Sequence, residues 1–140
     1  MAVTCRLVDY YALRLPDRPG TGAETLGVFR RARVALEAVH AFPDGRGCQL
    51  DLVPKDRRAF LRAARAAKLR LSRPKRALLV DGDDRTGALA GVLDAIAGAG
   101  VNVTAVTGVR AGRGRFGAIL WVKPRDVLHA ARALGVRGAR

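Results

Sequence analysis

The chain has 140 residues, of which 26 are Lys or Arg and 12 are Asp or Glu, so its formal net charge is +14. Hydrophobic residues make up 49% of the sequence, enough for the core of one ordinary domain or of two very small ones. No apolar run reaches the ~18–20 residues of a membrane span, and the N-terminus lacks the layout of a signal peptide. Two widely separated cysteines, Cys5 and Cys48, form neither a disulfide framework nor a metal site. We therefore expect a cytoplasmic protein with reduced cysteines, no metal and no cofactor.

The basic charge is spread evenly along the chain. Residues 1–70 hold 14 basic and 7 acidic residues, and residues 71–140 hold 12 and 5. Only four of the basic residues are lysines, and an Arg-, Ala- and Gly-rich composition is typical of a GC-rich genome. The functional alternative is attraction to a polyanion such as nucleic acid. Small sheets that bind nucleic acids usually display aromatic side chains for stacking, whereas aromatics are 5% here, so this alternative is not favoured.

The first half of the chain alternates between strand and helix patterns. Apolar and polar residues alternate from Val3 to Leu15, which predicts a strand that ends at Pro16–Gly20. One face of a helix is then predicted by four residues at i, i+3, i+4 and i+7: Gly22, Thr25, Leu26 and Phe29. A strand is then expected over 34–42, a hairpin loop over 43–47 and a half-exposed strand over 48–52. Asp56 is expected to cap a helix whose buried face holds Phe60, Ala63, Ala64 and Ala67. A short strand is expected over 68–72.

The second half repeats this order after a linker at 73–75. The elements expected are a strand over 78–80, a helix over 86–98, a strand over 101–109, a hairpin loop over 110–115, a strand over 116–122 and a helix over 127–134. Little chain remains after Gly135, so the last strand of this half is expected to be short or absent. Both sides of the strand over 116–122 are apolar, which predicts that helices cover one face and that the sister copy or a second chain covers the other.

The two halves are related by a constant shift of 67 positions. Residues 17–42 align without a gap with residues 84–109, and nine of the columns are identical, including Asp17/Asp84, Arg18/Arg85 and Gly20/Gly87. Three of the nine are Ala pairs, which count for little in an Ala-rich chain. The remaining six indicate two copies of one supersecondary unit.

Each copy has the order strand, helix, strand, strand, helix and a final strand. This is the ferredoxin-like split unit, with an antiparallel sheet and helices on one face. The predicted fold class is therefore α+β, built from two tandem βαββαβ units. The predicted domains are repeat 1 over 3–72 and repeat 2 over 76–137.

At the corner between the first strand and the first helix, the chain resembles the ACT-domain family of small-molecule-sensing regulatory modules. The habitual family pattern is Asp-Arg-Pro-Gly-x-Leu at this turn and Gly-Ile/Val-Asn-Ile/Val at the second strand. Copy one keeps Asp17, Arg18, Pro19 and Gly20 but has Gly22 for the Leu and Ala35 for the Asn. Copy two keeps Leu89 and Asn102 and has Thr86 for the Pro. The resemblance implies pairing of sheets edge to edge or face to face, and binding of free amino acids between paired units.

The residues of this corner also suit a zwitterionic ligand on chemical grounds. Gly87 opens a helix, whose first N–H groups and dipole favour a carboxylate, and a glycine lets a ligand approach the backbone. Asn102 offers a donor and an acceptor, Asp84 could accept an ammonium group, and Arg85 could bind a second carboxylate. Each residue also has a structural explanation: Gly87 as turn geometry, Asp84 as a helix-start acid, and Asn102 as a residue that satisfies a turn.

The sequence therefore predicts a non-enzymatic regulatory protein that binds an amino acid or related metabolite, with a homodimer as the expected assembly. The predicted ligand-binding residues are Asp84, Arg85, Thr86, Gly87, Ala88 and Asn102, with Asp17, Arg18, Pro19 and Gly20 as their counterparts in copy one. No set of nucleophile, base and orienting residue is apparent, and no membrane partner is expected. The second hypothesis is a basic ferredoxin-like module that binds nucleic acid through Arg58, Arg62, Arg65 and the loop at 110–115.

Overall fold

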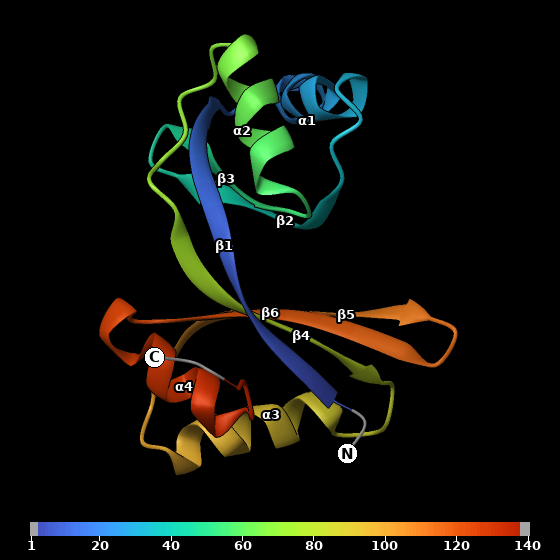
Figure 1. Ribbon diagram of the computed structural model, residues 1–140, viewed down its shortest axis with the longest axis vertical. Helices are drawn as coiled ribbons and strands as arrows, with labels where there is room; N and C mark the ends of the chain where they lie inside the picture. Colours follow the sequence, from blue (N-terminus) through green and yellow to red (C-terminus); the bar gives the residue numbers. More distant parts are fainter. Residues whose placement is uncertain (1–2, 138–140) are drawn as a thin grey trace. The chain divides into compact units, whose positions relative to one another are not determined.

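The computed structural model describes residues 3–137. Its strands are β1 (Val3–Pro16), β2 (Leu36–Asp44), β3 (Gly47–Pro54), β4 (Lys75–Asp83), β5 (Val103–Gly112) and β6 (Arg115–Val122). Its helices are α1 (Thr21–Arg31), α2 (Arg57–Ala66), α3 (Ala88–Gly98), the 3-10 turn η1 (Pro124–Asp126) and α4 (Val127–Ala133). The predicted order of elements is confirmed except for the short strand expected over 68–72 (Figure 1). None of the helices in the described range is long and apolar enough to cross a bilayer.

The chain divides into two compact units, and the division falls inside β1. The first unit comprises residues 9–75, and the second comprises residues 3–8 together with 76–137. In the first unit β3 pairs antiparallel with both β1 and β2. In the second unit β1 is followed by β4, β6 and β5. In each unit the two helices cover one face of the sheet (Figure 1).

Among residues 3–137 no strand follows Gly135, and the start of the chain lies beside β4 in the second unit. Val3, Cys5 and Leu7 pack against the core of the second unit, whereas Tyr11 and Leu13, farther along the same strand, belong to the core of the first. Within each unit these residues alternate along β1, so Val3, Cys5 and Leu7 share a face of the strand in the second unit, and Tyr11 and Leu13 share one in the first. The predicted range 3–72 for repeat 1 thus differs from the compact units, because residues 3–8 lie with the second.

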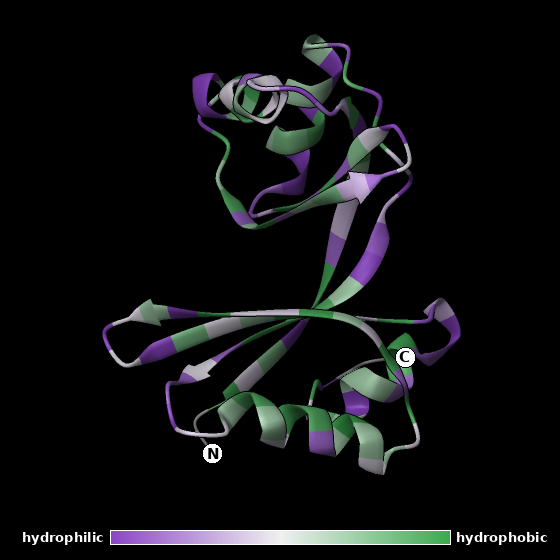
Figure 2. Cartoon of the chain, turned by 180° about the vertical axis from the view of Figure 1, so that it is seen from behind, coloured by the Kyte–Doolittle hydropathy of each residue, from purple (hydrophilic) through white to green (hydrophobic). Residues whose placement is uncertain are grey.

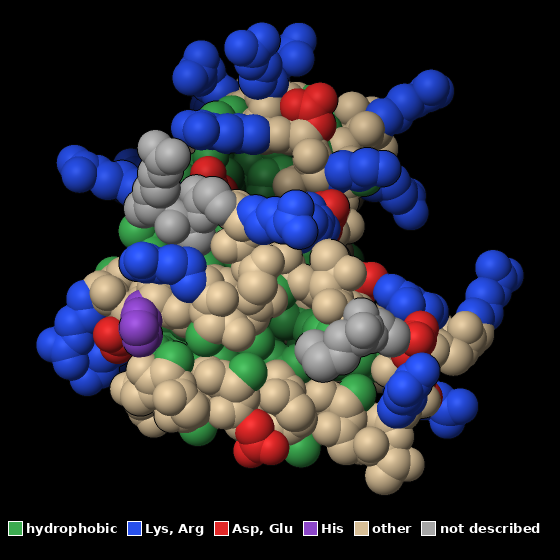
Figure 3. Space-filling view, turned by 60° about the horizontal axis from the view of Figure 1, so that its bottom comes forward, with side chains coloured by type: hydrophobic (Ala, Val, Ile, Leu, Met, Phe, Trp, Pro, Cys, Tyr) green, Lys and Arg blue, Asp and Glu red, His purple; other side chains and the backbone are tan. Residues whose placement is uncertain are grey.

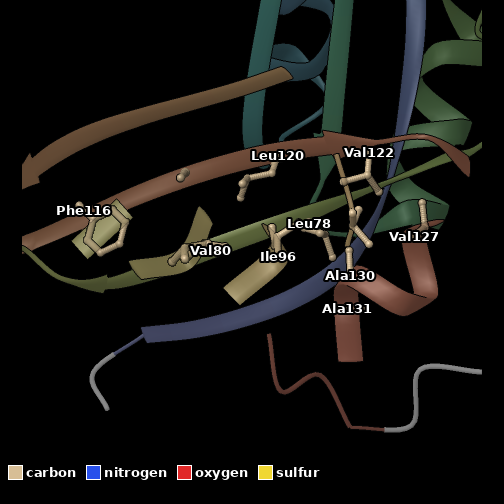
Figure 4. Packing of buried hydrophobic residues seen from close by; sticks show 12 residues of the cluster. Leu78, Val80, Ile96, Phe116, Leu120, Val122, Val127, Ala130 and Ala131 are labelled. Carbon is tan, nitrogen blue, oxygen red and sulfur yellow. The ribbon is translucent and has the colours of Figure 1, made fainter. Parts of the chain in front are cut away.

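The core of the second unit lies between its sheet and its two helices (Figure 4). Leu78 and Val80 of β4 and Leu120 of β6 point toward Ile96 of α3 and Ala130 of α4. Ile96, Leu120 and Ala130 are fully buried. Figure 2 shows why α3 can pack closely: it is hydrophobic along most of its length, with Asp94 as its one charged residue.

The core of the first unit is aromatic. Phe29 of α1 and Phe60 of α2 stack with ring centroids 4.6 Å apart, and Tyr11 of β1 lies 5.2 Å from Phe60. Asp56 caps α2 as predicted, since its side chain accepts a hydrogen bond from Ala59 N–H at 3.2 Å. The predicted buried face of α2 is correct for Phe60 and Ala64, but Ala67 is exposed because the helix ends at Ala66. No strand forms over 68–72, although Ser72 N–H donates to Ala12 O at 2.8 Å.

Backbone hydrogen bonds confirm the repeat with a shift of 67 positions. The bonds from Glu24 N–H to Gly20 O and from Val34 N–H to Phe29 O in the first unit recur as Gly91 to Gly87 and Val101 to Ile96 in the second. The bond from Leu69 N–H to Ala64 O recurs as Val136 to Ala131. The shift of 67 therefore applies at the first helix and again at the end of the second helix, beyond the aligned stretch of residues 17–42 and 84–109.

Two features of the strands differ from the predictions. The strand over 48–52 is not half-exposed, because Asp51 is 4% and Val53 1% exposed; Asp51 Oδ1 accepts a hydrogen bond from Gln49 Nε2 at 2.9 Å. The sequence shift between the two copies is also 68 instead of 67 at β6. Tyr11 pairs with Leu52 in the first unit, and its counterpart Leu78 pairs with Leu120 in the second. The hairpin before β6 accommodates the extra residue through three successive positive φ angles at Gly112, Arg113 and Gly114.

Candidate functional site

Gly20 and Gly87 occupy equivalent corners of the two units. Each is the N-cap of the first helix of its unit, with φ of +92° and +78° respectively. This left-handed conformation favours glycine. A Cβ placed on either residue would have no heavy atom within 4 Å, so backbone conformation and not crowding requires the glycine. In both copies the Asp-Arg-x-Gly turn thus needs its glycine for the backbone conformation, and the space next to that glycine, at the start of the helix, is open.

The acids before this turn in the second unit are held by arginines. Asp84 Oδ2 lies 2.7 Å from Arg110 Nε, and Arg115 contacts both Asp81 and Asp83. Asp84 N–H also donates to Gly114 O at 2.8 Å, which ties the turn to the β5–β6 hairpin. Asp84 is therefore already engaged by a guanidinium. No cluster of three or more acids, histidines or cysteines suited to a metal occurs among residues 3–137.

The other residues of this turn line a cavity of about 760 Å³, all of whose described walls belong to the second unit. Its size is within the range of small-molecule sites. Figure 3 looks toward the helix-bearing side of this unit and shows apolar side chains reaching the surface there. The lining residues are Val3, Cys5, Val80, Asp83, Arg85, Thr86, Gly87, Ala88, Gly91, Val92, Ala95, Ala133, Leu134 and Gly135.

Four of the six residues predicted in copy two, Arg85 to Ala88, therefore come together at one cavity. Arg85 has no acid partner among the described residues, in contrast to Arg110 and Arg115. The acid that lines the cavity is Asp83, its neighbour Asp84 being paired elsewhere. Asp83 Oδ1 accepts from Arg115 at 2.9 Å, and a carboxylate can accept further hydrogen bonds.

Asn102 lies at the other end of the same sheet. Both β4 and β5 are antiparallel to β6, so they run parallel to each other. Asp83 pairs with Arg115 and Val103 with Val122, positions seven residues apart along β6. At ~3.3 Å per residue this separates the turn from the start of β5 by roughly 23 Å. Asn102 is exposed and cannot reach a ligand at the turn of its own unit.

The corresponding corner of the first unit has different surroundings. Asp17, Arg18, Pro19 and Gly20 are all exposed. Thr21, which replaces Ala88, uses its hydroxyl to donate to Pro16 O at 2.9 Å and lies 3.2 Å from Arg18 O. Ala35, the counterpart of Asn102, lines a separate cavity of about 570 Å³ at the start of β2, away from this turn. The Thr21 hydroxyl thus serves local turn geometry, a role that the methyl group of Ala88 cannot play in the second unit.

Sequence reasoning missed Val3, Cys5, Asp83 and Leu134 as lining residues. Val3 and Cys5 appeared to belong to repeat 1, and Leu134 appeared to be the end of a helix. Asp83 directly precedes the predicted turn, so its position in the sequence alone is a sufficient signal. Leu134 reaches the cavity from the end of α4, and Val3 and Cys5 reach it because the chain start lies beside β4; no local pattern reveals these contacts.

Cys5 lines the cavity as a neutral thiol. Burial raises its pKa to about 11, against the smaller opposing effect of the Arg6 guanidinium. We predict that, in a Cys48→Ser variant at pH 8, native protein reacts with N-ethylmaleimide roughly 100-fold more slowly than unfolded protein, because the thiolate is the nucleophile. The raised pKa also means that the stabilisation from keeping this thiol protonated is complete below pH 9 and is lost as the pH rises through about 11. Equal rates in native and unfolded protein would contradict this assignment.

The basic groups of the nucleic-acid hypothesis divide into two sets. Arg58, Arg62 and Arg65 of α2 are exposed. In the loop at 110–115, Arg110 and Arg115 are engaged by Asp84, Asp81 and Asp83. The loop therefore presents less unpaired positive charge than its sequence suggests.

No protein-family model and no curated protein matches the sequence. Solved structures do match. A protein of Bacteroides thetaiotaomicron is 15% identical, with a TM-score of 0.75 over 91% of this chain and 88% of that chain. The regulatory subunit of aspartate kinase from Thermus thermophilus, in its ligand-free form, is 19% identical, with a TM-score of 0.61 over 96% of this chain and 95% of that chain.

Part of a larger enzyme also matches. Aspartokinase III of E. coli, in complex with aspartate and ADP, is 16% identical, with a TM-score of 0.51 over 94% of this chain but 32% of that chain. At such identities a likeness shows the fold alone. The chain therefore has the mixed α/β, ACT-like fold of aspartate kinase regulatory domains.

Proposed function

We propose that this chain is a non-enzymatic regulatory protein that binds a free amino acid or a related small metabolite at the β4–α3 turn of its second unit. The observation that carries the proposal is the cavity lined by Arg85, Thr86, Gly87 and Ala88. There an unpaired guanidinium lies beside the start of α3, where backbone N–H groups and the helix dipole favour a carboxylate. Asp83, which also accepts a hydrogen bond from Arg115, lines the same cavity, and its carboxylate can accept further hydrogen bonds from an ammonium group.

The solved structures support a regulatory role. Regulatory subunits of aspartate kinase share the fold over nearly their whole length, and aspartokinase III of E. coli, about a third of whose chain matches, was solved in complex with aspartate and ADP. A ligand can control a protein only if it binds one arrangement more tightly than another. We infer the same principle here, with a second copy or another protein as the responding partner.

A homodimer is the proposed assembly. The four exposed large apolar side chains of the described residues are Val39, Phe42, Val106 and Val109. They lie on β2 and β5, the strands at the two ends of the pairing order, and each pair is related by the shift of 67. An exposed apolar edge strand favours pairing with another chain. Antiparallel pairing of β5 with β5 of a second copy would bring Asn102 of one chain toward the turn of the other.

The test is a thermal-shift screen of the common amino acids. A ligand at 100 times its Kd stabilises the folded state by about 2.7 kcal/mol, which raises Tm by roughly 5–10 °C for a chain of this size. We expect Arg85→Gln to abolish most of the rise, whereas Arg113→Gln, which removes a charge from the neighbouring hairpin, leaves it intact. Sedimentation measurements with and without Asn102→Ala then show whether ligand binding and dimerisation are linked.

Nucleic-acid binding is the competing outcome of the same study. Binding that rests on phosphate contacts weakens steeply with salt, since counterions are released. If no amino acid changes Tm while RNA or DNA binds tightly at physiological salt, the regulatory proposal is wrong.

A further inference from the structure

The cavity of the second unit has polar groups on one side and aliphatic walls elsewhere. Its polar side holds Arg85 and Asp83, next to the turn. The remaining walls come from Val3, Val80, Val92 and Leu134, which reach it from β1, β4, α3 and the end of α4. No aromatic ring and no charged side chain other than these two is among its described lining residues.

Small residues keep the α3 side of this cavity open. Gly91 and Ala95 follow Gly87 along the helix and also line the cavity. A Cβ on Gly91 would have no heavy atom within 4 Å, so a larger side chain there would enter space that is open at present. Cys5, which also lines the cavity, adds no charge to it, since its thiol stays protonated at neutral pH.

The first unit differs at the equivalent positions. Glu24 stands where the second unit has Gly91, and Lys68 where it has Gly135. Thr25 replaces Val92, and its hydroxyl donates to Thr21 O at 3.0 Å. The first unit thus carries a charged or polar side chain at three positions where the second unit has glycine or valine.

We infer that the cavity of the second unit selects an α-amino acid with an aliphatic side chain, such as leucine or valine, and that each chain binds one. This inference rests on the proposed function and names its substrate class. The α-carboxylate lies at Arg85 and the turn, the ammonium group lies at Asp83, and the hydrocarbon side chain lies against Val3, Val92 and Leu134. Each additional buried CH₂ group strengthens binding roughly four-fold.

Isosteric ligand pairs separate shape from polarity. L-Leucine and L-asparagine have nearly the same outline, as do L-valine and L-threonine. A hydrocarbon-lined pocket rejects a polar isostere by roughly 10- to 100-fold, because the polar group loses water without gaining a partner. Isothermal titration of the intact protein with these four amino acids is therefore the primary measurement, with the stoichiometry read from the same curves.

Gly91→Glu is the decisive variant, since it installs the residue of the first unit in the second. It replaces a glycine in a helix interior by a good helix former, so folding is not weakened. We expect leucine binding to fall at least ten-fold. The matched control is Ala90→Glu, which adds the same charge at the neighbouring exposed position, outside the cavity lining, and should retain wild-type affinity.

The outcomes distinguish the two proposals. Tighter binding of leucine and valine than of their isosteres, one site per chain and loss in Gly91→Glu support the inference. Preferred binding of aspartate, lysine or asparagine, or leucine binding unchanged in Gly91→Glu, overturns the inference and leaves an amino-acid-binding regulator. If no amino acid binds at all, the proposed function itself fails.

Discussion

A chain that begins at Asp9 will lose the structure of its second unit while it keeps that of its first. Residues 3–8 supply the strand beside β4, and Val3, Cys5 and Leu7 pack against the core of that unit. Their removal exposes Leu78 and Val80 of β4, which are now 1% exposed, together with one side of the β4 backbone. The free energy lost with these apolar contacts and strand hydrogen bonds is larger than the few kcal/mol by which a small domain is stable.

Hydrogen–deuterium exchange will measure this effect peptide by peptide. We expect amides of β4, α3 and α4 to exchange at nearly unfolded rates in the truncated chain, and amides of β3 and α2 to stay protected. In the full-length chain, Leu7→Asp should have the same effect in milder form. Thr4→Asp, an equal change at an exposed position of the same strand, should have little effect. Unchanged protection of α4 in the truncated chain would show that the second unit does not need the chain start.

Alanine substitutions at Phe29 and Ile96 will each unfold mainly their own unit. These residues are related by the shift of 67 and are 1% and 0% exposed in the first and second units. A Phe→Ala change in a core costs about 3–5 kcal/mol and an Ile→Ala change about 2–5 kcal/mol. Phe29→Ala also removes the ring that stacks on Phe60. Either cost is a large fraction of the stability of a unit of this size.

Each of the two variants is the control for the other. Urea denaturation followed by hydrogen–deuterium exchange should show that the amides of α1, α2 and β3 lose protection in Phe29→Ala. In Ile96→Ala the amides of α3, α4 and β6 should lose protection. Because β1 belongs to both units, a smaller effect is expected in the partner unit, at the residues around Val8 and Asp9. Equal loss of protection throughout the chain in both variants would mean that the described residues form one cooperative unit.

The site was predictable where it depends on local backbone geometry. Glycines at 20 and 87 were expected at turns that open helices, and both adopt positive φ there. Asp56 was expected to cap α2, and it does. These features depend on residues a few positions apart, so sequence spacing is sufficient to predict them.

The charge partners and the cavity walls were not predictable in the same way. Asp84 was expected to face a ligand, but it lies 2.7 Å from Arg110. Asn102 was expected near the turn, yet the parallel course of β4 and β5 places it at the opposite end of the sheet. Whether the turn of one chain meets Asn102 of another remains a prediction for the dimer.

The sequence by itself determined the order of elements, the 67-residue repeat and the glycine corners, because these follow from side-chain periodicity and backbone preference over short distances. Only the tertiary structure decided that residues 3–8 complete the second unit and that Val3 and Cys5 line its cavity. The physical reason is that alternation along β1 specifies which side chains share a face. Which neighbouring strand accepts the hydrogen bonds of each half depends on contacts between residues distant in the sequence, such as Tyr11 with Leu52 in the first unit, and no local pattern encodes that choice.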